Sequence, residues 1–288
     1  KMFPGEPDEN FIFICRNEHL EKTDMRKILN NLKPNAKIIE TQPAKLGPVY
    51  AVTKAFDFID DEEQVIVNYC DFFQSWDYED FKKVVNENKC DGNVVSYIGF
   101  HPHLLIKDNF YATTNVDENN YVSEIREKYS FTEDKTKCPQ SGGTYYFKKG
   151  SYVKKYFTEL MERDINLKGE FYVSLVYNLM IEDGLKIHVY DKVKHFCQWG
   201  IPQDLSAYNY WSDIFKALIR DKKNIKIENL INLIPMAGAG SRFRKEGYTI
   251  SKPLIKVSNK HMIFQASDML PKADEWVYVC REEDIQNE

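Results

Sequence analysis

The stretch that decides the fold reads Leu233-Ile234-Pro235-Met236-Ala237-Gly238-Ala239-Gly240-Ser241-Arg242-Phe243. An apolar run ends in a glycine-rich turn, and an arginine follows at once. Glycines let backbone N–H groups approach a polyphosphate closely and form a concave site for anions. Arg242 can bind phosphate oxygens through its forked guanidinium, and Lys252 adds a second cation. The pattern therefore predicts a strand, a phosphate-binding turn and a helix. For the two glycines taken alone, a plain turn is the alternative.

Outward from this stretch, apolar strands alternate with amphipathic helices. Strands are predicted at residues 11–15, 36–40, 64–68, 93–100, 121–125, 144–147, 187–190 and 194–197. Helices are predicted at residues 18–32, 48–59, 77 onward, 151–163, 171–182 and 203–219. Apolar strands that alternate with helices are typical of an α/β sheet covered on both faces.

Composition excludes several classes of protein. The chain has 288 residues and a net charge of −5, so it lacks the basic surface of a general nucleic-acid binder. No apolar run approaches the ~20 residues that a membrane span needs. The six cysteines are scattered without a C-x-x-C pair, which is typical of reduced thiols in a cytoplasmic protein. The acidic, turn-rich first ten residues do not fit a signal peptide.

An internal repeat links the two ends of the chain. Met2-Phe3-Pro4 and the segment 11–18 are similar to Met269-Leu270-Pro271 and the segment 276–283. The offset between Cys15 and Cys280 is 265 residues. A chance match of two strands is the alternative. Homology predicts that the chain is slightly more than one period of a tandem duplication.

Three motifs together carry a family resemblance. The stretch 233–243, followed by Ser251-Lys252-Pro253-Leu254-Ile255 and Asn259-Lys260-His261-Met262-Ile263, resembles the N-terminal signature of the sugar-phosphate nucleotidyltransferases. That signature reads G-x-G-(T/S)-R, then P-K-P-L, then G-K-P-M-I. The departures at Ser251, Asn259 and His261 remove no charged group.

This resemblance implies a fold and a nucleotide site. The fold would be α/β, with a Rossmann-like mixed sheet and helices on both faces, of the nucleotidyltransferase or GT-A-like type. Arg242 would hold the triphosphate and Lys252 would bridge to the substrate phosphate, so both would be catalytic. The turn residues that would wrap the nucleotide are Gly238, Ala239, Gly240 and Ser241.

Further motifs follow in residues 1–220. Gln42-Pro43-Ala44-Lys45-Leu46-Gly47 resembles the segment that reads the base, which implies nucleotide contacts for Gln42 and Gly47. A loop between a strand and a helix is the alternative. Asp71, just beyond the strand at 64–68, resembles the family's catalytic, magnesium-binding aspartate. As a bare aspartate it could equally cap a turn.

Other motifs resemble the segments that bind the acceptor in this family. Ser141-Gly142-Gly143-Thr144-Tyr145-Tyr146-Phe147 resembles the acceptor segment, which implies substrate binding by Gly143. Glu170 resembles the acid that binds the sugar, although a helix N-terminal acid is the alternative. Gln198 stands where many members carry a second metal-binding aspartate. An amide binds Mg²⁺ more weakly than a carboxylate, so its role as a metal ligand is doubtful.

The implied reaction joins a nucleoside triphosphate to a sugar 1-phosphate, or a similar phosphorylated headgroup, and releases pyrophosphate. Mg²⁺ is the implied cofactor, and surface polysaccharide synthesis in the cytoplasm is the implied role. No nucleic acid or membrane is expected as a partner. A GT-A-like glycosyltransferase is one alternative, although no D-x-D motif follows Cys70. A non-catalytic nucleotide-binding module is another. The base and the acceptor stay open.

Connectivity is unusual, because the glycine-rich turn follows Asp71 whereas in the family it precedes it. The prediction is a nucleotidyltransferase domain at 1–220 that lacks its own first strand and glycine-rich turn, a linker at 221–228, and the start of a second repeat at 229–288. The last part would complete the first domain by folding back or by a swap in a homo-oligomer, or it would belong to a separate repeat whose remainder is absent. The hypothesis is that the chain is a fragment of a longer tandem protein and that residues 229–270 still occupy the vacant central position.

Two smaller patterns have structural interpretations. His101 and His103 form an H-x-H pair that is expected on the surface or in a loop. The aromatic segment 208–215 has near-helical spacing and is expected to pack in a core.

Overall fold

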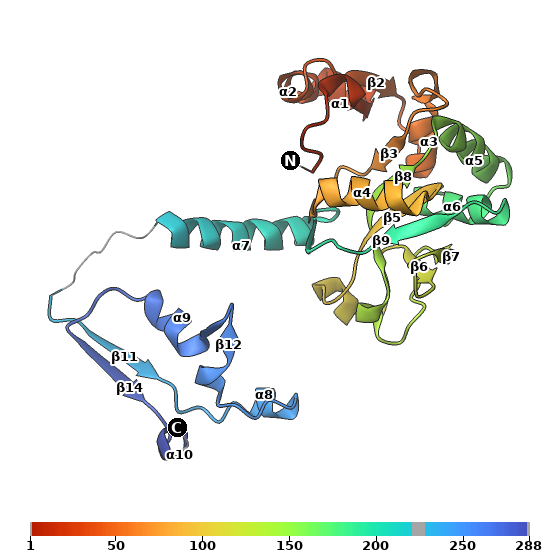
Figure 1. Cartoon of the computed structure of the whole chain (residues 1–288). Coiled ribbons are helices and arrows are strands. Elements are labelled where there is room, and N and C mark those ends of the chain that lie inside the picture. The colour runs from red at the N-terminus through yellow and green to blue at the C-terminus, as the bar shows by residue number, and fades with distance from the viewer. Residues whose placement is uncertain (1, 221–227, 287–288) are drawn as a thin grey trace. The chain divides into compact units, whose positions relative to one another are not determined.

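The computed structural model describes residues 2–220 and 228–286 (Figure 1). It divides into two compact units, Lys1–Leu205 (unit 1) and Ser206–Glu288 (unit 2). Residues 221–227 of the predicted linker lie outside the described residues. The predicted domains at 1–220 and 229–288 were defined by the internal repeat as well as by compactness. The division into two compact units does not test the repeat, so these domains stay a prediction.

The core of unit 1 is a mixed sheet in the order β7-β6-β8-β5-β9. Its central strand, β8, is antiparallel to β5 along one edge. On the other edge of β8, β3 pairs with residues 144–147, and β6 pairs at Gln140. The strands of this sheet are β3 (Val65–Asn68), β5 (Gly92–Tyr97), β6 (Thr113–Val116), β7 (Val122–Arg126), β8 (Gln140–Phe147) and β9 (Ile187–Tyr190).

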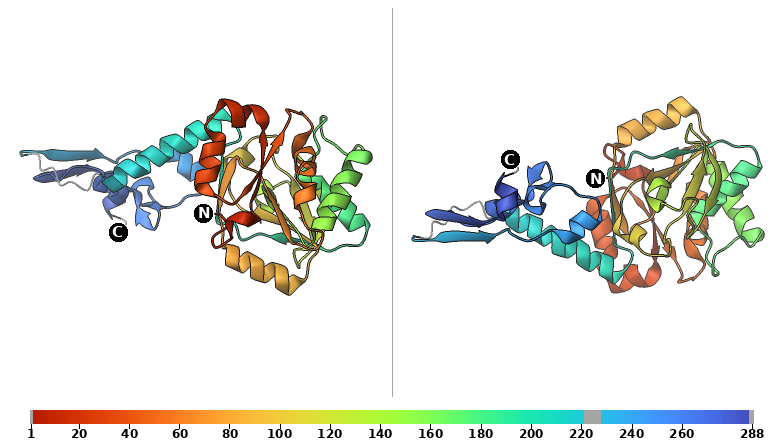
Figure 2. Two further views of the ribbon diagram at one scale, coloured as in Figure 1. Left: turned by 90° about the horizontal axis from the view of Figure 1, so that it is seen from above. Right: turned by 90° about the horizontal axis from the view of Figure 1, so that it is seen from below.

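Helices cover both faces of this sheet. Successive residues of a strand point to opposite faces. Accordingly, Tyr145 and Phe147 of β8 pack in one core with α3, α5 and α6, and Tyr146 packs in a second core with α4. Figure 2 shows α4 and the α5–α6 pair on different sides of the strands. The helices are α3 (Gly47–Thr53), α4 (Tyr78–Asn88), α5 (Gly150–Glu162) and α6 (Val173–Glu182). The predicted fold class is confirmed.

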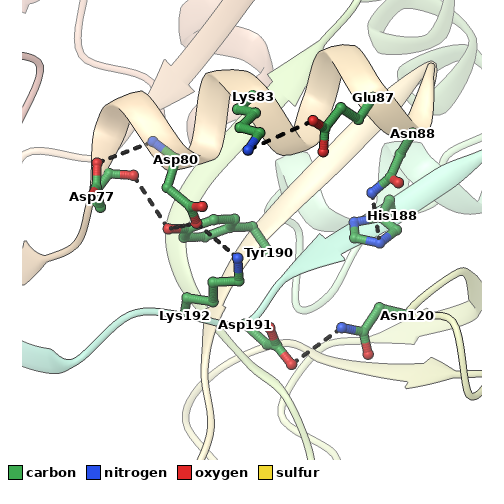
Figure 3. Close-up of polar contacts among 10 residues, drawn as sticks. All are labelled: Asp77, Asp80, Lys83, Glu87, Asn88, Asn120, His188, Tyr190, Asp191 and Lys192. Carbon is green, nitrogen blue, oxygen red and sulfur yellow. Dashed lines mark hydrogen bonds and ion pairs between the residues drawn. The ribbon is translucent and has the colours of Figure 1, made fainter.

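Helix α4 begins at a side-chain cap and is tied to the end of β9 (Figure 3). The Asp77 carboxylate accepts the N–H of Asp80 at 3.0 Å. The Asp80 carboxylate in turn accepts the Tyr190 hydroxyl at 3.0 Å and the Lys192 ammonium at 2.9 Å. Hydrogen bonding from Lys192 keeps the pKa of Asp80 below its usual range. These contacts fix the helix against the sheet at its N-terminal end.

Two short strand pairs complete unit 1. Strand β1 (Ile12–Arg16) runs parallel to β2 (Lys37–Thr41), and β4 (Phe72–Ser75) runs antiparallel to β10 (His195–Gln198). Figure 1 shows β2 and the helices α1 (Asn17–Lys22) and α2 (Met25–Leu32) together at the top of unit 1.

The structure corrects several expected element boundaries. The helix predicted at 18–32 is two helices, because the Thr23 hydroxyl bonds the His19 carbonyl at 2.6 Å and ends the first one. The helix predicted at 48–59 ends at Thr53 and continues as a 3₁₀ turn, Phe56–Phe58. Strands β4 and β6 were not predicted.

Unit 2 has a small parallel sheet of its own. Strand β11 (Ile231–Pro235) pairs in parallel with β14 (Glu275–Val279). Helix α7 (Pro202–Arg220) begins before the boundary between the units and ends in unit 2. The remaining elements are α8 (Ser241–Lys245), a 3₁₀ turn (Lys252–Leu254), β12 (Lys256–Val257), β13 (Lys260–His261), α9 (Met262–Asp268) and α10 (Glu282–Gln286).

The expectation about the aromatic side chains of α7 is wrong. They do not pack in a core: Tyr210, Trp211 and Phe215 are each more than half exposed. The histidine pair lies in a turn after β5, in agreement with the predicted loop position, but it is not a surface pair. His103 is buried among rings and bonds the Tyr97 hydroxyl at 2.9 Å. Burial lowers the pKa of His103 to about 3, so its ring is neutral near pH 7.

Candidate active site

A cavity of about 600 Å³ opens in unit 1 beside β8. Residues Gly142 and Gly143 of β8 line it, between the segments of β8 that pair with β3 and with β6. Four residues that the sequence singled out come together here: Asp71, Gly143, Glu170 and Gln198. They come from positions between 71 and 198, so only the fold places them around one cavity.

Asp71 lies three residues beyond the end of β3, and its side chain is exposed. Its carbonyl accepts the N–H of Trp199 at 2.8 Å, which ties it to the end of β10. A Cβ atom on Gly200 would stand 3.1 Å from the Asp71 carboxylate. Gly200 therefore lets the chain pass close to this carboxylate and leaves it open to the cavity.

Gln198 is held on both sides of its amide. The side-chain nitrogen donates to the Asp204 carboxylate at 2.6 Å, and the side-chain oxygen accepts the Tyr111 hydroxyl. Burial raises the pKa of Tyr111, and the charges of Asp204 and Asp71 raise it further. Two carboxylates therefore lie near this hydroxyl, and the amide oxygen already has a donor.

This arrangement fits a magnesium ion that is completed by its substrate. No group of three or more histidine, cysteine, aspartate or glutamate side chains within residues 2–220 and 228–286 could hold a metal by itself. Mg²⁺ usually takes one or two carboxylates and fills its other positions with water and substrate phosphates. Asp71 can serve as such a ligand, and Asp204 lines the same cavity. Gln198 fits a ligand role poorly because its oxygen accepts Tyr111.

Glu170 is not a helix cap. Helix α6 begins at Val173 with Tyr172 as its N-cap, so Glu170 lies outside the helix. Its backbone closes a tight turn with Leu167, and its carboxylate accepts the Tyr172 hydroxyl at 2.6 Å. The turn directs this carboxylate to the cavity, where an acceptor hydroxyl can reach it.

Glu127 and Lys128 also line the cavity, and neither was predicted from the sequence. Burial raises the pKa of Glu127 to about 6, against the lowering effect of the Ser174 hydroxyl, which donates to it. Lys128 stands 5.6 Å from the centre of the Tyr172 ring. The sequence signal that could have identified them is a pair of oppositely charged residues directly after the strand β7. This signal was overlooked because the sequence between residues 101 and 142 shows little regular pattern.

Gly47 has a structural reason to be glycine. Its φ is +82°, and a Cβ atom would stand 2.8 Å from both N and O of Phe171. The Phe171 N–H donates to the Leu46 carbonyl at 2.9 Å, which explains the close approach. Gly47 thus lies beside Glu170, although Gly47 itself does not line the cavity. Gln42 is exposed in the segment after β2, and it does not line the cavity.

The glycine-rich turn belongs to unit 2 and connects β11 with α8, as predicted. Gly240 has a φ of +63°, and a Cβ there would stand 3.2 Å from the Cβ of Lys252. Nothing lies within 4 Å of the Cβ position of Gly238, so that backbone is open. Ser241 and Arg242 form the first turn of α8 with exposed side chains, and Ala239 precedes Gly240. Arg242 and Lys252 therefore both place an exposed cationic side chain at the glycine-rich turn.

Comparisons with known proteins concern the fold. No protein-family model matches the chain, and no curated protein matches its sequence. Solved structures do match. The nucleoside-diphosphate-sugar pyrophosphorylase from Vibrio cholerae RC9 is 21% identical with a TM-score of 0.57, covering 72% of this chain and 81% of that one.

A second solved structure agrees. A protein described as a glucose-1-phosphate thymidylyltransferase from Bacillus anthracis is 16% identical with a TM-score of 0.52, covering 70% of this chain and 75% of that one. The family resemblance seen in the sequence is therefore confirmed at the level of the fold. Within the described ranges, no helix is both long and apolar enough to cross a bilayer.

Proposed function

We propose that this chain is a nucleotidyltransferase that couples a nucleoside triphosphate to a sugar 1-phosphate, or a similar phosphorylated headgroup, and releases pyrophosphate. The observation that supports it is the cavity that gathers Asp71, Gly143, Glu170 and Gln198 on a nucleotidyltransferase fold. Its volume of about 600 Å³ is in the range of small-molecule sites.

The chemistry needs charge neutralisation more than a base. A phosphate oxygen of the acceptor attacks the α-phosphorus in line, and pyrophosphate leaves. The acceptor phosphate is already ionised near pH 7, so no nucleophile–base pair is required. Bound Mg²⁺ would neutralise charge on the phosphates and stabilise the transition state. Asp71 would hold it, with Asp204 beside it.

The chain's own groups have distinct tasks. Lys128 is the one lysine, arginine or histidine among the cavity-lining residues in the described part of the chain, so it would bind the acceptor phosphate. Glu170 would accept a hydrogen bond from an acceptor hydroxyl, and the backbone at Gly143 leaves room for the acceptor. Arg242, Lys252 and the open backbone from Gly238 to Ser241 would bind the triphosphate.

Pyrophosphate release tests this proposal. The chain is incubated with Mg²⁺, a panel of nucleoside triphosphates, and sugar 1-phosphates or phosphorylated headgroups. We expect release with one pair, and a loss of at least 100-fold in Asp71→Ala. Asp61→Ala is the control, because Asp61 is an exposed carboxylate that pairs with Lys154. It should keep the full rate.

The other outcomes point to the alternatives. Triphosphate binding without pyrophosphate release from any pair would favour the non-catalytic module. Transfer from a nucleotide sugar would favour the glycosyltransferase. An Asp71→Ala chain with an unchanged rate would remove Asp71 from the site. A role in surface polysaccharide precursor synthesis in the cytoplasm belongs to the same proposal, and the accepted phosphate would identify it.

A further inference from the structure

A chain of hydrogen bonds runs through the turn after β5, next to the wall of the cavity. His101 is the N-cap of the 3₁₀ turn Pro102–Leu105, and His103 lies within this turn. Neither ring lines the cavity. Burial lowers the pKa of both rings, so both are neutral near pH 7. A neutral imidazole has one donor nitrogen and one acceptor nitrogen.

The contacts of the two rings decide where each proton lies. The backbone N–H of His103 donates to Nδ1 of His101 at 3.4 Å, so this Nδ1 is an acceptor and carries no proton. The two Nδ1 atoms are also in hydrogen-bond contact, so the proton between them belongs to His103. Nε2 of His103 is then the acceptor for the Tyr97 hydroxyl at 2.9 Å. The rings are therefore opposite tautomers, with the proton on Nε2 of His101 and on Nδ1 of His103.

The first ring of the pair contacts strand β10. Burial lowers the pKa of His101, and a hydrogen bond between its ring and the Phe196 backbone opposes this effect. The proton on Nε2 suits this bond, because a backbone carbonyl only accepts. The Phe196 ring also stacks on the Tyr97 ring, with centroids 4.9 Å apart. Phe196 lines the cavity, and Gln198 follows two residues later on the same strand.

The second ring of the pair contacts Tyr111. The rings of His103 and Tyr111 pack edge to face, with centroids 4.7 Å apart. The Tyr111 hydroxyl donates to the side-chain oxygen of Gln198, and the nitrogen of the same amide donates to Asp204 at 2.6 Å. The orientation of the Gln198 amide therefore depends on where the Tyr111 ring lies. All three of these partners line the cavity, whereas His103 does not.

The hydrogen bonds give this part of the cavity wall a single arrangement. Rings that only pack can rotate and slide past one another, whereas rings that exchange hydrogen bonds are held at fixed angles. A buried polar network whose members are all satisfied is rigid and specifies one structure. Such a network lies against Phe196 and Tyr111, which both line the cavity. It can therefore set the shape of the wall without touching what the cavity holds.

We propose that His101 and His103 are positioning residues for the candidate active site. As opposite tautomers they fix the ring of Tyr111. Tyr111 in turn holds the Gln198 amide with its nitrogen toward Asp204. Turned the other way, the amide would set its oxygen against the Asp204 carboxylate, where neither acceptor has a donor. The inference rests on the proposed function where it predicts rates, and on hydrogen bonding alone where it predicts tautomers.

Nitrogen-15 NMR of the imidazole rings tests the tautomers without any activity measurement. The six histidines of the chain are labelled, and the two signals are assigned from chains that lack His101 or His103. Near pH 7 we expect a proton on Nδ1 of His103 and on Nε2 of His101. A proton on Nε2 of His103 would overturn the inference, because the ring could then not donate to His101.

Three variants test the effect on turnover. His101→Ala removes the acceptor for the His103 proton, so we expect kcat to fall at least tenfold and the KM of each substrate to change less than twofold. His101→Asn should restore kcat to within threefold of the parent, because its side-chain oxygen can accept in place of Nδ1. His195→Ala is the control, since His195 is exposed on β10 beside Phe196. It should keep the full rate.

A double-mutant cycle tests whether the pair acts through Tyr111. Tyr111→Phe keeps the ring but removes the bond to Gln198. Adding His101→Ala to Tyr111→Phe should therefore lower kcat less than twofold further. Losses that multiply would overturn the inference, and so would a His101→Asn chain no faster than His101→Ala. A parent chain without turnover would count against the proposed function alone, and the tautomers would then decide the inference.

Discussion

At the scale of single residues, Glu127 is the group whose environment differs most from what its neighbours in sequence suggest. It follows an exposed arginine and precedes an exposed lysine, yet its carboxyl is directed into the cavity beside Ser174. Burial raises its pKa from 4.5 to about 6. The folded chain therefore holds this proton more tightly than the unfolded chain does.

This shift predicts how stability depends on pH. Between pH 4.5 and pH 6 the folded state binds more protons, so the free energy of unfolding falls as the pH rises. The contribution of Glu127 is full below about pH 4.5 and is lost above about pH 6, and it amounts to about 2 kcal/mol. Glu127→Gln stays neutral, so its stability relative to the parent should rise by about that amount from pH 4 to pH 7. Urea unfolding at several pH values measures it.

The matched control lies on β7, the strand that ends just before Glu127. The Glu124 side chain is 41% exposed and pairs with Arg126, so Glu124→Gln should leave the pH dependence of the parent unchanged. A Glu127→Gln chain whose stability runs parallel to that of the parent across this range would show that Glu127 titrates normally.

At the scale of elements, helix α4 shows a boundary that the sequence specifies on its own. The Asp77 carboxylate caps the helix through the N–H of Asp80, and the helix was predicted to begin at residue 77. Asp77→Ala should lower the free energy of unfolding by about 1 kcal/mol, whereas Asp77→Asn should retain most of the cap. Thermal unfolding of the three chains measures this. Equal losses in both variants would assign the effect to the Asp77 charge.

Elements with a strong local signal were predictable, and the others depended on tertiary contacts. The second half of β8, residues 144–147, and helix α6 were predicted because their apolar residues are continuous or recur with a helical period. β4 and β6 are short and partly polar and follow polar loops, so they show no apolar run that marks a strand. The aromatic face of α7 has the period of a core helix, yet it is exposed. The periodicity of a helix indicates which face is apolar, but it does not indicate whether another part of the protein packs against that face.

The candidate site was predictable in its residue types and not in its contacts. Asp71, Gly143, Glu170 and Gln198 were singled out by resemblance, and the fold places them around one cavity. The two hydrogen bonds that hold the amide of Gln198 could not be inferred, because Tyr111 lies 87 residues away in a segment without a clear pattern. Glu127 was missed for the same reason.

At the scale of the whole molecule, the two units differ in how completely their sheets are formed. β8 lies between strands on both edges and is buried along its length. β11 has one neighbour and is largely exposed. Local opening is easiest where few apolar groups are buried, so amide protection should differ strongly between the two strands. One global unfolding free energy does not describe such a chain.

Hydrogen exchange turns this difference into a prediction. The amides of β11 and β14 should exchange at least 100-fold faster than those of β8, because β11 pairs along one edge and is largely exposed, whereas β8 pairs along both edges and is buried. β8 in the same sample is the internal reference for the exchange rates. Equal protection of the three strands would contradict this prediction, because it would mean that the two sheets open together.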